Sequence, residues 1–149
     1  MGIGYGQAGA LCEVLEHDEL DVRTLSVCDL GSQKVIPAEV NGLLNTLLRG
    51  TNLPGKQLHT SLGFKEYTSI DLDGADGARQ FDLGKNLRDT YGFGDQFDLA
   101  TNSGTAEHVF AQAEFFANMH ELTKLGGLML HSLPSRGWSQ HGFYRYDDV

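Results

Sequence analysis

The stretch FDLATNSG, residues 97–104, decides the fold that this sequence predicts. Its apolar first half predicts a buried strand, and Ser103-Gly104 predicts the turn that follows. A long helix is expected from about Thr105 to Lys124, because apolar side chains recur on one face of it. Gly126-Gly127 would end that helix, and residues 128–133 predict the next strand. Strand, helix and strand in succession form the repeating unit of a parallel sheet.

Further strands and helices are predicted upstream of that unit. Compact apolar runs predict strands over residues 24–30, 67–72 and 79–83. Helical spacing, or a proline in the opening turn, predicts helices over residues 10–20, 37–48 and 85–91. The alternation predicts an α/β fold, with a doubly wound, mainly parallel, Rossmann-like sheet of about five strands and helices on both faces.

The chain is expected to form a single domain over residues 1–149. Residues 1–23 would be a helical lead-in, residues 24–133 the core that carries the strands, and residues 134–149 a tail rich in aromatic side chains. The core therefore contains every strand end that the search for a site has to consider.

Composition and charge exclude several classes of function. Apolar residues make up 40% of the 149 residues and charged residues 21%, which is typical of a soluble globular protein. The formal net charge of −9 argues against an electrostatic nucleic-acid binder and against a polybasic membrane-surface protein. A small-molecule substrate or a protein partner stays open.

The cellular compartment is predicted from what the sequence lacks. We find no secretory signal at its start and no apolar run long enough to span a bilayer. Cys12 and Cys28 form neither a metal-binding spacing nor a disulfide framework. A reduced, cytoplasmic protein is therefore expected.

The stretch Gly4-Tyr5-Gly6-Gln7-Ala8-Gly9 matches the pattern G-x-G-x-x-G. That pattern cradles a pyrophosphate where it lies between a strand and a helix. Too few residues precede Gly4 for a buried strand. We therefore interpret the stretch as a flexible lead-in to the first helix, near the cleft that would hold a cofactor. A nicotinamide-dependent oxidoreductase would need the motif after the first strand, and none is there.

Polar residues stand at the ends of the predicted strands, where ligands bind in open α/β sheets. Gly31 lets the backbone approach a ligand closely, and Asp29 could hold that turn or accept a hydrogen bond from a ligand ammonium. Asp71 is placed to accept both hydroxyls of a ribose, and Asp82 could accept from an adenine amino group. Each of these acids could instead cap a turn.

Five segments, taken in order, resemble the motifs of class I S-adenosylmethionine-dependent methyltransferases. They are LSVCDLGSQ, YTSIDLDG, FDLGKNL, FDLATNSGTAEHV and LTKLGGLMLH. The resemblance covers residues 24–133. It implies S-adenosylmethionine as cofactor and methyl transfer to a small-molecule or sugar-like acceptor. In such enzymes the protein supplies proximity, orientation and in some cases a general base.

The resemblance also implies roles at the first two strand ends. Asp29 and Gly31 match the motif that wraps the methionine part of the cofactor, and Ser32 stands in for a further small residue. Asp71 matches the acid that binds the ribose hydroxyls, with Leu72 beside the adenine.

The later strand ends complete the implied cofactor site. Asp82 and Leu83 match the pair that contacts adenine. Asn102, Ser103 and Gly104 match the turn after the fourth strand, near both cofactor and substrate.

Two features depart from the family pattern. The first motif usually reads D/E-x-G-x-G-x-G, whereas Asp29-Leu30-Gly31-Ser32-Gln33 holds one glycine. Residues 134–149 are too short for the usual final helix and antiparallel strand pair, so the C-terminal antiparallel pair is expected to be missing. A homo-oligomer could cover the open edge that results. These departures motivate the alternative function, a non-catalytic methyltransferase-like module for binding or oligomerisation.

A general base is sought among His108, His141 and Tyr144. His108 follows Glu107 at the start of the predicted long helix and could be a packed residue or a base. The aromatic stretch Trp138–Tyr146 could be a lip that faces the substrate, with His141 or Tyr144 near the acceptor. It could equally be a packing or dimer segment.

The remaining histidines are given no catalytic role. His17 and His59 are expected at the surface. His120, His131 and His141 lack the spacing of a zinc site, so no metal is expected.

Overall fold

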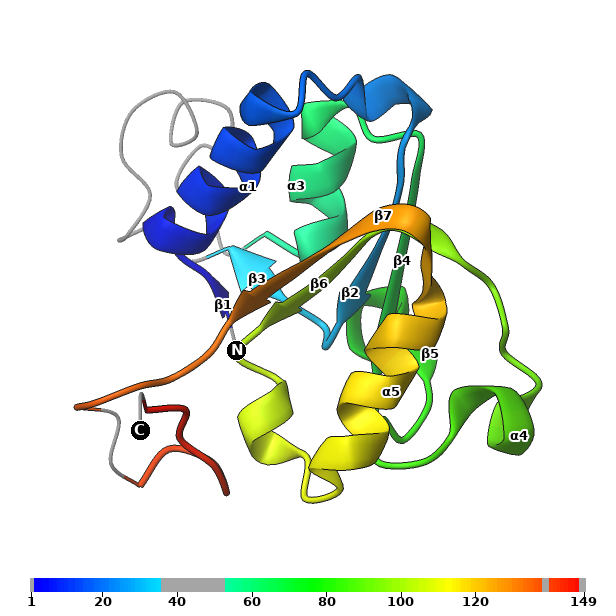
Figure 1. Cartoon of the computed structure of the whole chain (residues 1–149), viewed down its shortest axis with the longest axis vertical. Coiled ribbons are helices and arrows are strands. Elements are labelled where there is room, and N and C mark those ends of the chain that lie inside the picture. Colours follow the sequence, from blue (N-terminus) through cyan, green and yellow to red (C-terminus); the bar gives the residue numbers. More distant parts are fainter. Residues whose placement is uncertain (1, 36–52, 138–139, 148–149) are drawn as a thin grey trace.

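The structure, a computed structural model, describes residues 2–35, 53–137 and 140–147. Its centre is a five-stranded sheet in the order β5-β4-β2-β6-β7, and every pair in it is parallel (Figure 1). The strands are β2 (Ser26–Leu30), β4 (Glu66–Asp71), β5 (Arg79–Gln80), β6 (Phe97–Ser103) and β7 (Thr123–Ser132). The predicted parallel α/β fold is confirmed.

The strand order reverses at β2. From this strand the chain runs outward to β4 and β5 on one side, and then returns to β6 and β7 on the other. In open parallel sheets the ligand crevice lies at such a reversal, beyond the carboxyl ends of the strands. The fold therefore directs attention to the residues that follow β2, β4 and β6.

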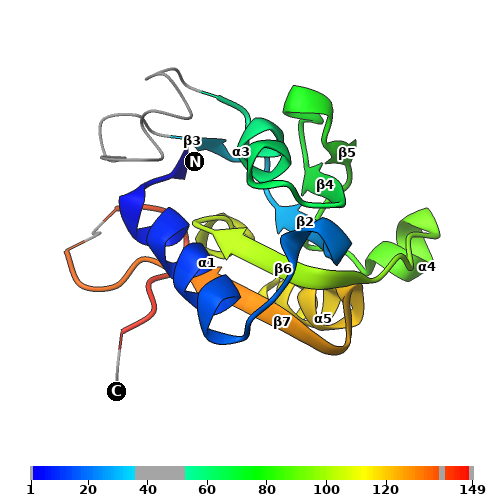
Figure 2. The same cartoon turned by 90° about the horizontal axis from the view of Figure 1, so that it is seen from above.

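Four helices are described, and they cover both faces of the sheet (Figures 1 and 2). They are α1 (Tyr5–His17), α3 (Gly55–Leu62), α4 (Leu87–Tyr91) and α5 (Gln112–Leu122). On one face Leu11 of α1 packs with Leu99 of β6, and on the other Phe115 of α5 packs with Ala100 of the same strand. Leu99 and Ala100 are neighbours in sequence, so the alternation along one strand separates the two layers of the core.

The N-terminal glycines belong to helix α1. A short strand β1 (Gly2–Ile3) pairs in parallel with β3 (Lys34–Val35), and Ile3 is buried. Gly4 is the N-cap of α1, and its backbone N–H donates to the Gln7 side chain at 3.0 Å. The predicted helix over 10–20 thus begins at Tyr5 and ends at His17, and the interpretation of Gly4–Gly9 as a flexible lead-in is wrong.

The helix predicted from Thr105 to Lys124 is broken in two. A short 3-10 turn, η4 (Ala106–His108), comes first, and α5 begins only at Gln112. The Asn102 Oδ1 atom accepts the backbone N–H groups of Thr105 (3.1 Å) and Ala106 (3.2 Å), so it holds the chain in a tight turn where an α-helix was expected.

Gly126 and Gly127 do not end a helix. They lie inside β7, which begins at Thr123 and is longer than the predicted strand over 128–133. A Cβ on Gly127 would lie 2.9 Å from the Asp98 carbonyl oxygen, so the close approach of β6 requires glycine there. The register between β6 and β7 shifts at this point.

Other boundaries were predicted with mixed success. Helix α4 ends at Gly92, which has a φ of +65°, as the sequence predicts. Helix α3 was not predicted, and the third strand shrinks to two residues, Arg79–Gln80. The helix predicted over residues 37–48 lies outside the described residues.

The outer edge of β7 pairs with no strand in the described parts of the chain. Leu125 and Met129 of this strand are exposed. Within the same parts of the chain, no helix has the length and apolar character needed to cross a membrane.

Candidate functional site at the carboxyl ends of the strands

The turn after β2 lies against the turn after β6. Gly31 has a φ of +111°, and a Cβ at this position would lie 2.2 Å from Thr105 Oγ1. Gln33 is buried, and its Nε2 atom donates to Thr105 Oγ1 at 3.0 Å. Sequence reasoning gave no role to Gln33 or Thr105, although both lie in the quoted motif segments, because neither side chain carries a charge. Together with Gly31 they join the ends of β2 and β6 in direct contact.

Asp71 at the end of β4 joins this turn from the other side. Its Oδ2 atom accepts the backbone N–H of Ser32 at 2.6 Å, and its carboxylate is half-buried. The expected adjacency of the β2 and β4 ends is therefore present. Leu72 is the first residue beyond β4 and is 66% exposed, so it offers an apolar surface beside the Asp71 carboxylate.

Asp29 is turned into the protein. Its side chain is buried, and it accepts hydrogen bonds from Tyr67 Oη (2.9 Å) and Thr101 Oγ1. These partners belong to β4 and β6, so Asp29 bonds the central strand to both of its neighbours. Burial, and then the charge of Asp29, raise the pKa of the Tyr67 phenol. This strand-bonding role of the Asp29 carboxylate was not expected from the sequence, and its contact with a cofactor stays a prediction.

His59 lies beside this buried cluster, which corrects its expected place at the surface. Its side chain is 1% exposed and packs between the rings of Phe64 and Tyr67. The Nδ1 atom is 2.9 Å from the Gly55 carbonyl oxygen and 3.9 Å from Asp29 Oδ2. His17, in contrast, is exposed as predicted.

Asp82 and Leu83 have different environments. Leu83 is buried in the core cluster that contains α5, so its side chain contributes packing. Asp82 is half-buried, and its Oδ1 atom accepts the backbone N–H of Gly84 at 2.9 Å. Asp82 lies two residues beyond Gln80, the partner of Asp71 in the sheet, and so stays at the same edge.

Asn102 is fully buried, and its hydrogen bonds fix the state of His131. Its Oδ1 atom accepts the two backbone N–H groups of the η4 turn, so its Nδ2 atom faces His131 Nδ1 at 3.3 Å. An amide nitrogen only donates, so His131 Nδ1 accepts and the neutral ring carries its proton on Nε2. Burial lowers the pKa of His131, which favours this neutral form.

A hollow of about 220 Å³ lies beside these groups. Ser103, His131 and Ser132 line it from the ends of β6 and β7, and Gly6 and Gln7 line it from α1. The G-x-G-x-x-G stretch therefore borders the same edge of the sheet as the predicted cofactor residues, although it forms no loop between strand and helix.

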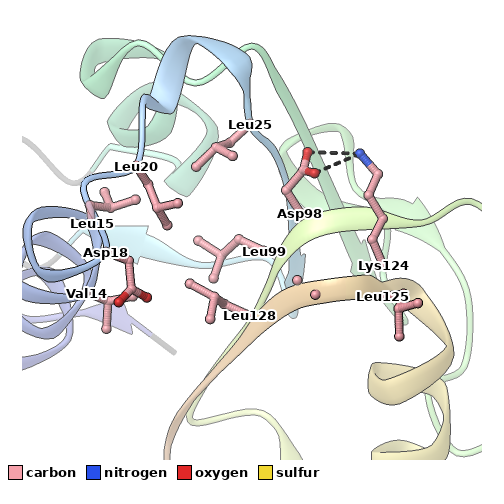
Figure 3. Close-up of a pocket in the computed structure, with 12 residues that line it drawn as sticks. Val14, Leu15, Asp18, Leu20, Leu25, Asp98, Leu99, Lys124, Leu125 and Leu128 are labelled. Carbon is pink, nitrogen blue, oxygen red and sulfur yellow. Dashed lines mark hydrogen bonds and ion pairs between the residues drawn. The ribbon is translucent and has the colours of Figure 1, made fainter.

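A second hollow, of about 200 Å³, lies near the amino ends of the strands, opposite the carboxyl ends described above (Figure 3). Leucine side chains dominate its wall, and Asp98 and Lys124 form an ion pair of 2.9 Å at its rim. Burial acts to raise the pKa of Asp98, but hydrogen bonds from Ser26 and Lys124 outweigh it and lower the pKa to about 2. None of the predicted cofactor residues lines this hollow.

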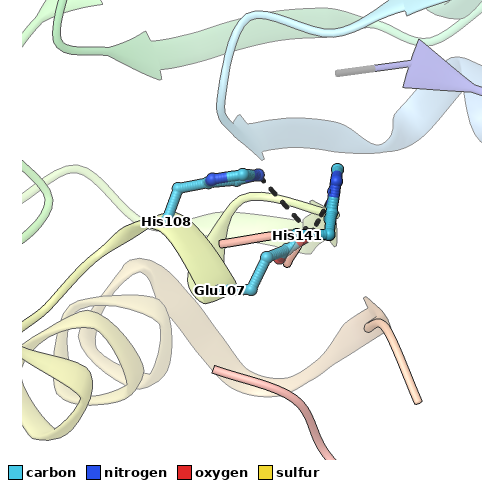
Figure 4. Close-up of side chains that lie close together, drawn as sticks. All are labelled: Glu107, His108 and His141. Atoms are coloured by element: carbon cyan, nitrogen blue, oxygen red, sulfur yellow. Dashed lines mark ion pairs between the residues drawn. The ribbon is translucent and has the colours of Figure 1, made fainter. Parts of the chain in front are cut away.

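The three residues considered as a general base lie around Glu107. His108 and His141 both approach the Glu107 carboxylate (Figure 4). Tyr144 Oη donates to the Phe110 carbonyl oxygen at 2.9 Å, so its hydroxyl is engaged by the backbone. Trp138 and Ser139 lie outside the described residues.

Comparison with known proteins adds no assignment: no family model, no curated protein and no solved structure matches this chain. The residues at the carboxyl ends of β2, β4 and β6 are therefore the basis for assigning a function. Those ends bring together a glycine turn, a half-buried carboxylate, an exposed leucine and a hollow with a mixed polar and apolar lining.

Proposed function

We propose that this protein binds S-adenosylmethionine in the crevice between β2 and β6 and transfers its methyl group to a small-molecule or sugar-like acceptor. One observation carries the proposal. The half-buried Asp71 carboxylate at the end of β4 hydrogen-bonds, at 2.6 Å, the Ser32 turn that follows β2. A carboxylate next to the β2 turn at the strand-order reversal is the arrangement with which parallel sheets hold a ribose.

The residues around Asp71 fit such a cofactor. Asp71 would accept the ribose hydroxyls, and the exposed Leu72 would pack on the adenine ring. Gly31 and Ser32 would face the methionine part with their backbone. When bound, S-adenosylmethionine supplies a methyl group on a positively charged sulfur, which an acceptor nucleophile displaces. The net charge of −9 favours a cationic cofactor and disfavours a nucleic-acid acceptor.

The hollow beside Ser103 would hold the acceptor. Its lining is mixed: Gln7 from α1 and Ser132 from β7 would hydrogen-bond a hydroxyl of the acceptor, and Ala10 and Leu130 would contact its carbon atoms. His131 carries its proton on Nε2 and would therefore donate a hydrogen bond to an acceptor oxygen. In this protonation state it orients the acceptor rather than deprotonating it.

Calorimetry with S-adenosylhomocysteine, the demethylated product, tests the cofactor site. We expect the wild type to bind and Asp71→Asn to bind at least about tenfold more weakly, because a hydrogen bond to a charged group contributes about 1.5–3 kcal/mol. Asp89→Asn is the matched control, since Asp89 is an exposed acid on α4. Thermal unfolding of each variant checks that it is folded. Absence of heat with the wild type, or equal affinity in both variants, would refute the proposal.

A second candidate is a non-catalytic module that associates through the edge of the sheet. The exposure of Leu125 and Met129 on β7, an edge strand in the described parts of the chain, favours it. Light scattering on the same samples separates the two candidates. A stable dimer that gives no heat with S-adenosylhomocysteine would support the module.

A further inference from the structure

Glu107, His108 and His141 form a cluster that no sequence motif indicated (Figure 4). The Glu107 Oε1 atom lies 3.5 Å from His141 Nε2 and 3.9 Å from His108 Nε2. The two imidazole rings are 5.0 Å apart and nearly perpendicular, at 74°. One potential ligand atom from each residue lies within 4.8 Å of the other two.

The Glu107 carboxylate is buried, and one of its two oxygen atoms has no hydrogen-bond partner. Its side chain is 1% exposed, and its Oε2 atom is enclosed without a hydrogen-bond partner. Leaving a buried carboxylate oxygen without a partner is energetically costly, so such a group is normally paired or coordinates a metal. The histidines, at 39% and 41% exposure, lie between this carboxylate and solvent.

The backbone holds the three residues together. Asn102 fixes the η4 turn that carries Glu107 and His108. The Glu107 carbonyl oxygen accepts the backbone N–H of Phe143 at 2.6 Å, which fixes the tail beside the turn. A Cβ on Gly142 would lie 2.6 Å from the same oxygen, so glycine is required for the tail to pass. His141 is the neighbour of this glycine.

We propose that Glu107, His108 and His141 bind a divalent transition-metal ion of the zinc type. Two imidazole nitrogens and one carboxylate oxygen suit zinc and its first-row neighbours, and three protein ligands leave a position open for water or a substrate. Ligand atoms around one tetrahedral zinc lie about 3.4 Å apart. The observed 3.5 and 3.9 Å come close to that spacing, and rotation of the part-exposed imidazoles completes it.

The site adjoins the crevice. A Cβ on Gly104 would lie 3.2 Å from Glu107 Oε1, and Gly104 closes the turn after β6. The metal site itself is independent of methyl transfer. The open position on the metal would bind an oxygen atom of the methyl acceptor, and this further role rests on the proposed function.

Zinc titration of the full chain, stripped with EDTA and desalted, tests the site without cofactor. We expect one tightly bound ion per chain, measured by competition with a chromogenic chelator. Glu107→Gln and His108→Ala should each weaken zinc binding by at least about tenfold. Removing a residue that only hydrogen-bonds a metal ligand typically lowers metal affinity about 10–100-fold, and removing a ligand itself should lower it at least as much. His120→Ala is the matched control, because His120 is an exposed histidine on α5 outside the cluster.

The variants also protect the test against misfolding. Glu107→Gln keeps the shape of the side chain, and His108 is part-exposed, so its removal leaves the core intact. Co²⁺ absorption spectra of the wild type and of His141→Ala report directly on the imidazole ligands. Zinc binding of equal strength in the wild type and Glu107→Gln, or no binding by the wild type, would overturn the proposal and leave a carboxylate–imidazole ion-pair cluster.

Discussion

At the scale of single residues, backbone conformation and close contact decide which side chains the crevice tolerates. Gly31 combines a φ of +111° with a neighbour, Thr105 Oγ1, where its Cβ would be. Gln33 hydrogen-bonds the same threonine and closes off any shift on that side. One glycine in the first motif is therefore enough to bring the ends of β2 and β6 together.

Gly31→Ala should destabilise the fold by about 2–4 kcal/mol, through strain at positive φ and overpacking against Thr105. Urea unfolding at equilibrium measures the change. Gly92→Ala is the matched control, since Gly92 also has a positive φ but meets nothing within 4 Å. The control should lose only about 1–2 kcal/mol, the cost of the left-handed conformation. Equal losses in the two variants would show that the Thr105 contact is unimportant.

At the scale of elements, one ionic cluster ties the beginnings of three strands. Asp98 at the start of β6 accepts the Ser26 backbone N–H of β2 at 2.8 Å and pairs with Lys124 of β7 at 2.9 Å. The cluster lies where the β6–β7 register shifts and Gly127 passes close to β6. It therefore sets the position at which β7 joins the sheet.

The contribution of Asp98 to stability should depend on pH. Its pKa is lowered to about 2 in the folded chain, against about 3.9 in an unfolded one. The carboxylate therefore stabilises the fold above about pH 4, and that contribution is lost as pH falls toward 2. Because Asp98 and Lys124 are partly exposed, we expect only about 0.5–1 kcal/mol.

Urea unfolding of the wild type and Asp98→Asn at pH 7, 4 and 2 measures this dependence. The two proteins should differ most at pH 7 and become nearly alike near pH 2, where about half of the native carboxyls are protonated. Asp89→Asn, on the exposed face of α4, controls for the general loss of one negative charge. A difference between wild type and Asp98→Asn that stays constant from pH 7 to pH 2 would contradict the assignment.

At the scale of the whole molecule, the two cysteines differ in how deeply they are buried. Cys28 lies on the central strand β2 and is fully buried, whereas Cys12 on α1 is only half-buried. Burial, reinforced by the nearby Asp29 charge, raises the pKa of the Cys28 thiol strongly. Because the thiolate is the reactive form, Cys28 should react only after the sheet opens.

Burial and the charge of Glu16 also raise the pKa of Cys12, but Cys12 is only half-buried. A thiol reagent at pH 8 should therefore label Cys12 of the native protein first, and Cys28 only at the rate at which the protein opens. Both should react quickly in urea. Cys12→Ser should remove the fast phase alone, which identifies it. A ligand that stabilises the fold should slow the second phase. Fast labelling of Cys28 in native buffer would show that β2 is not protected as the structure indicates.

How far the sequence predicts the fold depends on the range of the interaction. Apolar runs near 24–30 and 97–102 predicted the two central strands almost to their ends, because burial on both faces leaves a local signature. The helix from Thr105 to Lys124 was wrong at both ends. Its start depends on a buried Asn102 side chain, and its end on the close approach of β6 to Gly127.

The candidate site divides along the same line. Strand ends placed Gly31, Ser32 and Asp71 at one edge, and the structure joins Ser32 to Asp71 there. The same reasoning could not show that the side chains of Asp29 and Asn102 hydrogen-bond to groups inside the protein. The sequence pattern of a polar residue at a strand end is the same whether its side chain faces a ligand or a neighbouring strand.

Local patterns along the chain were sufficient to predict a parallel α/β sheet and the strand ends at which its polar residues gather, because periodicity and strand ends are local properties. Which side chains contact one another became known from the three-dimensional structure. It placed β2 between β4 and β6, buried His59 beside Asp29, and brought His141 from the tail to Glu107 and His108. These contacts join residues far apart in the chain, and no periodic pattern records which distant neighbour a side chain will find.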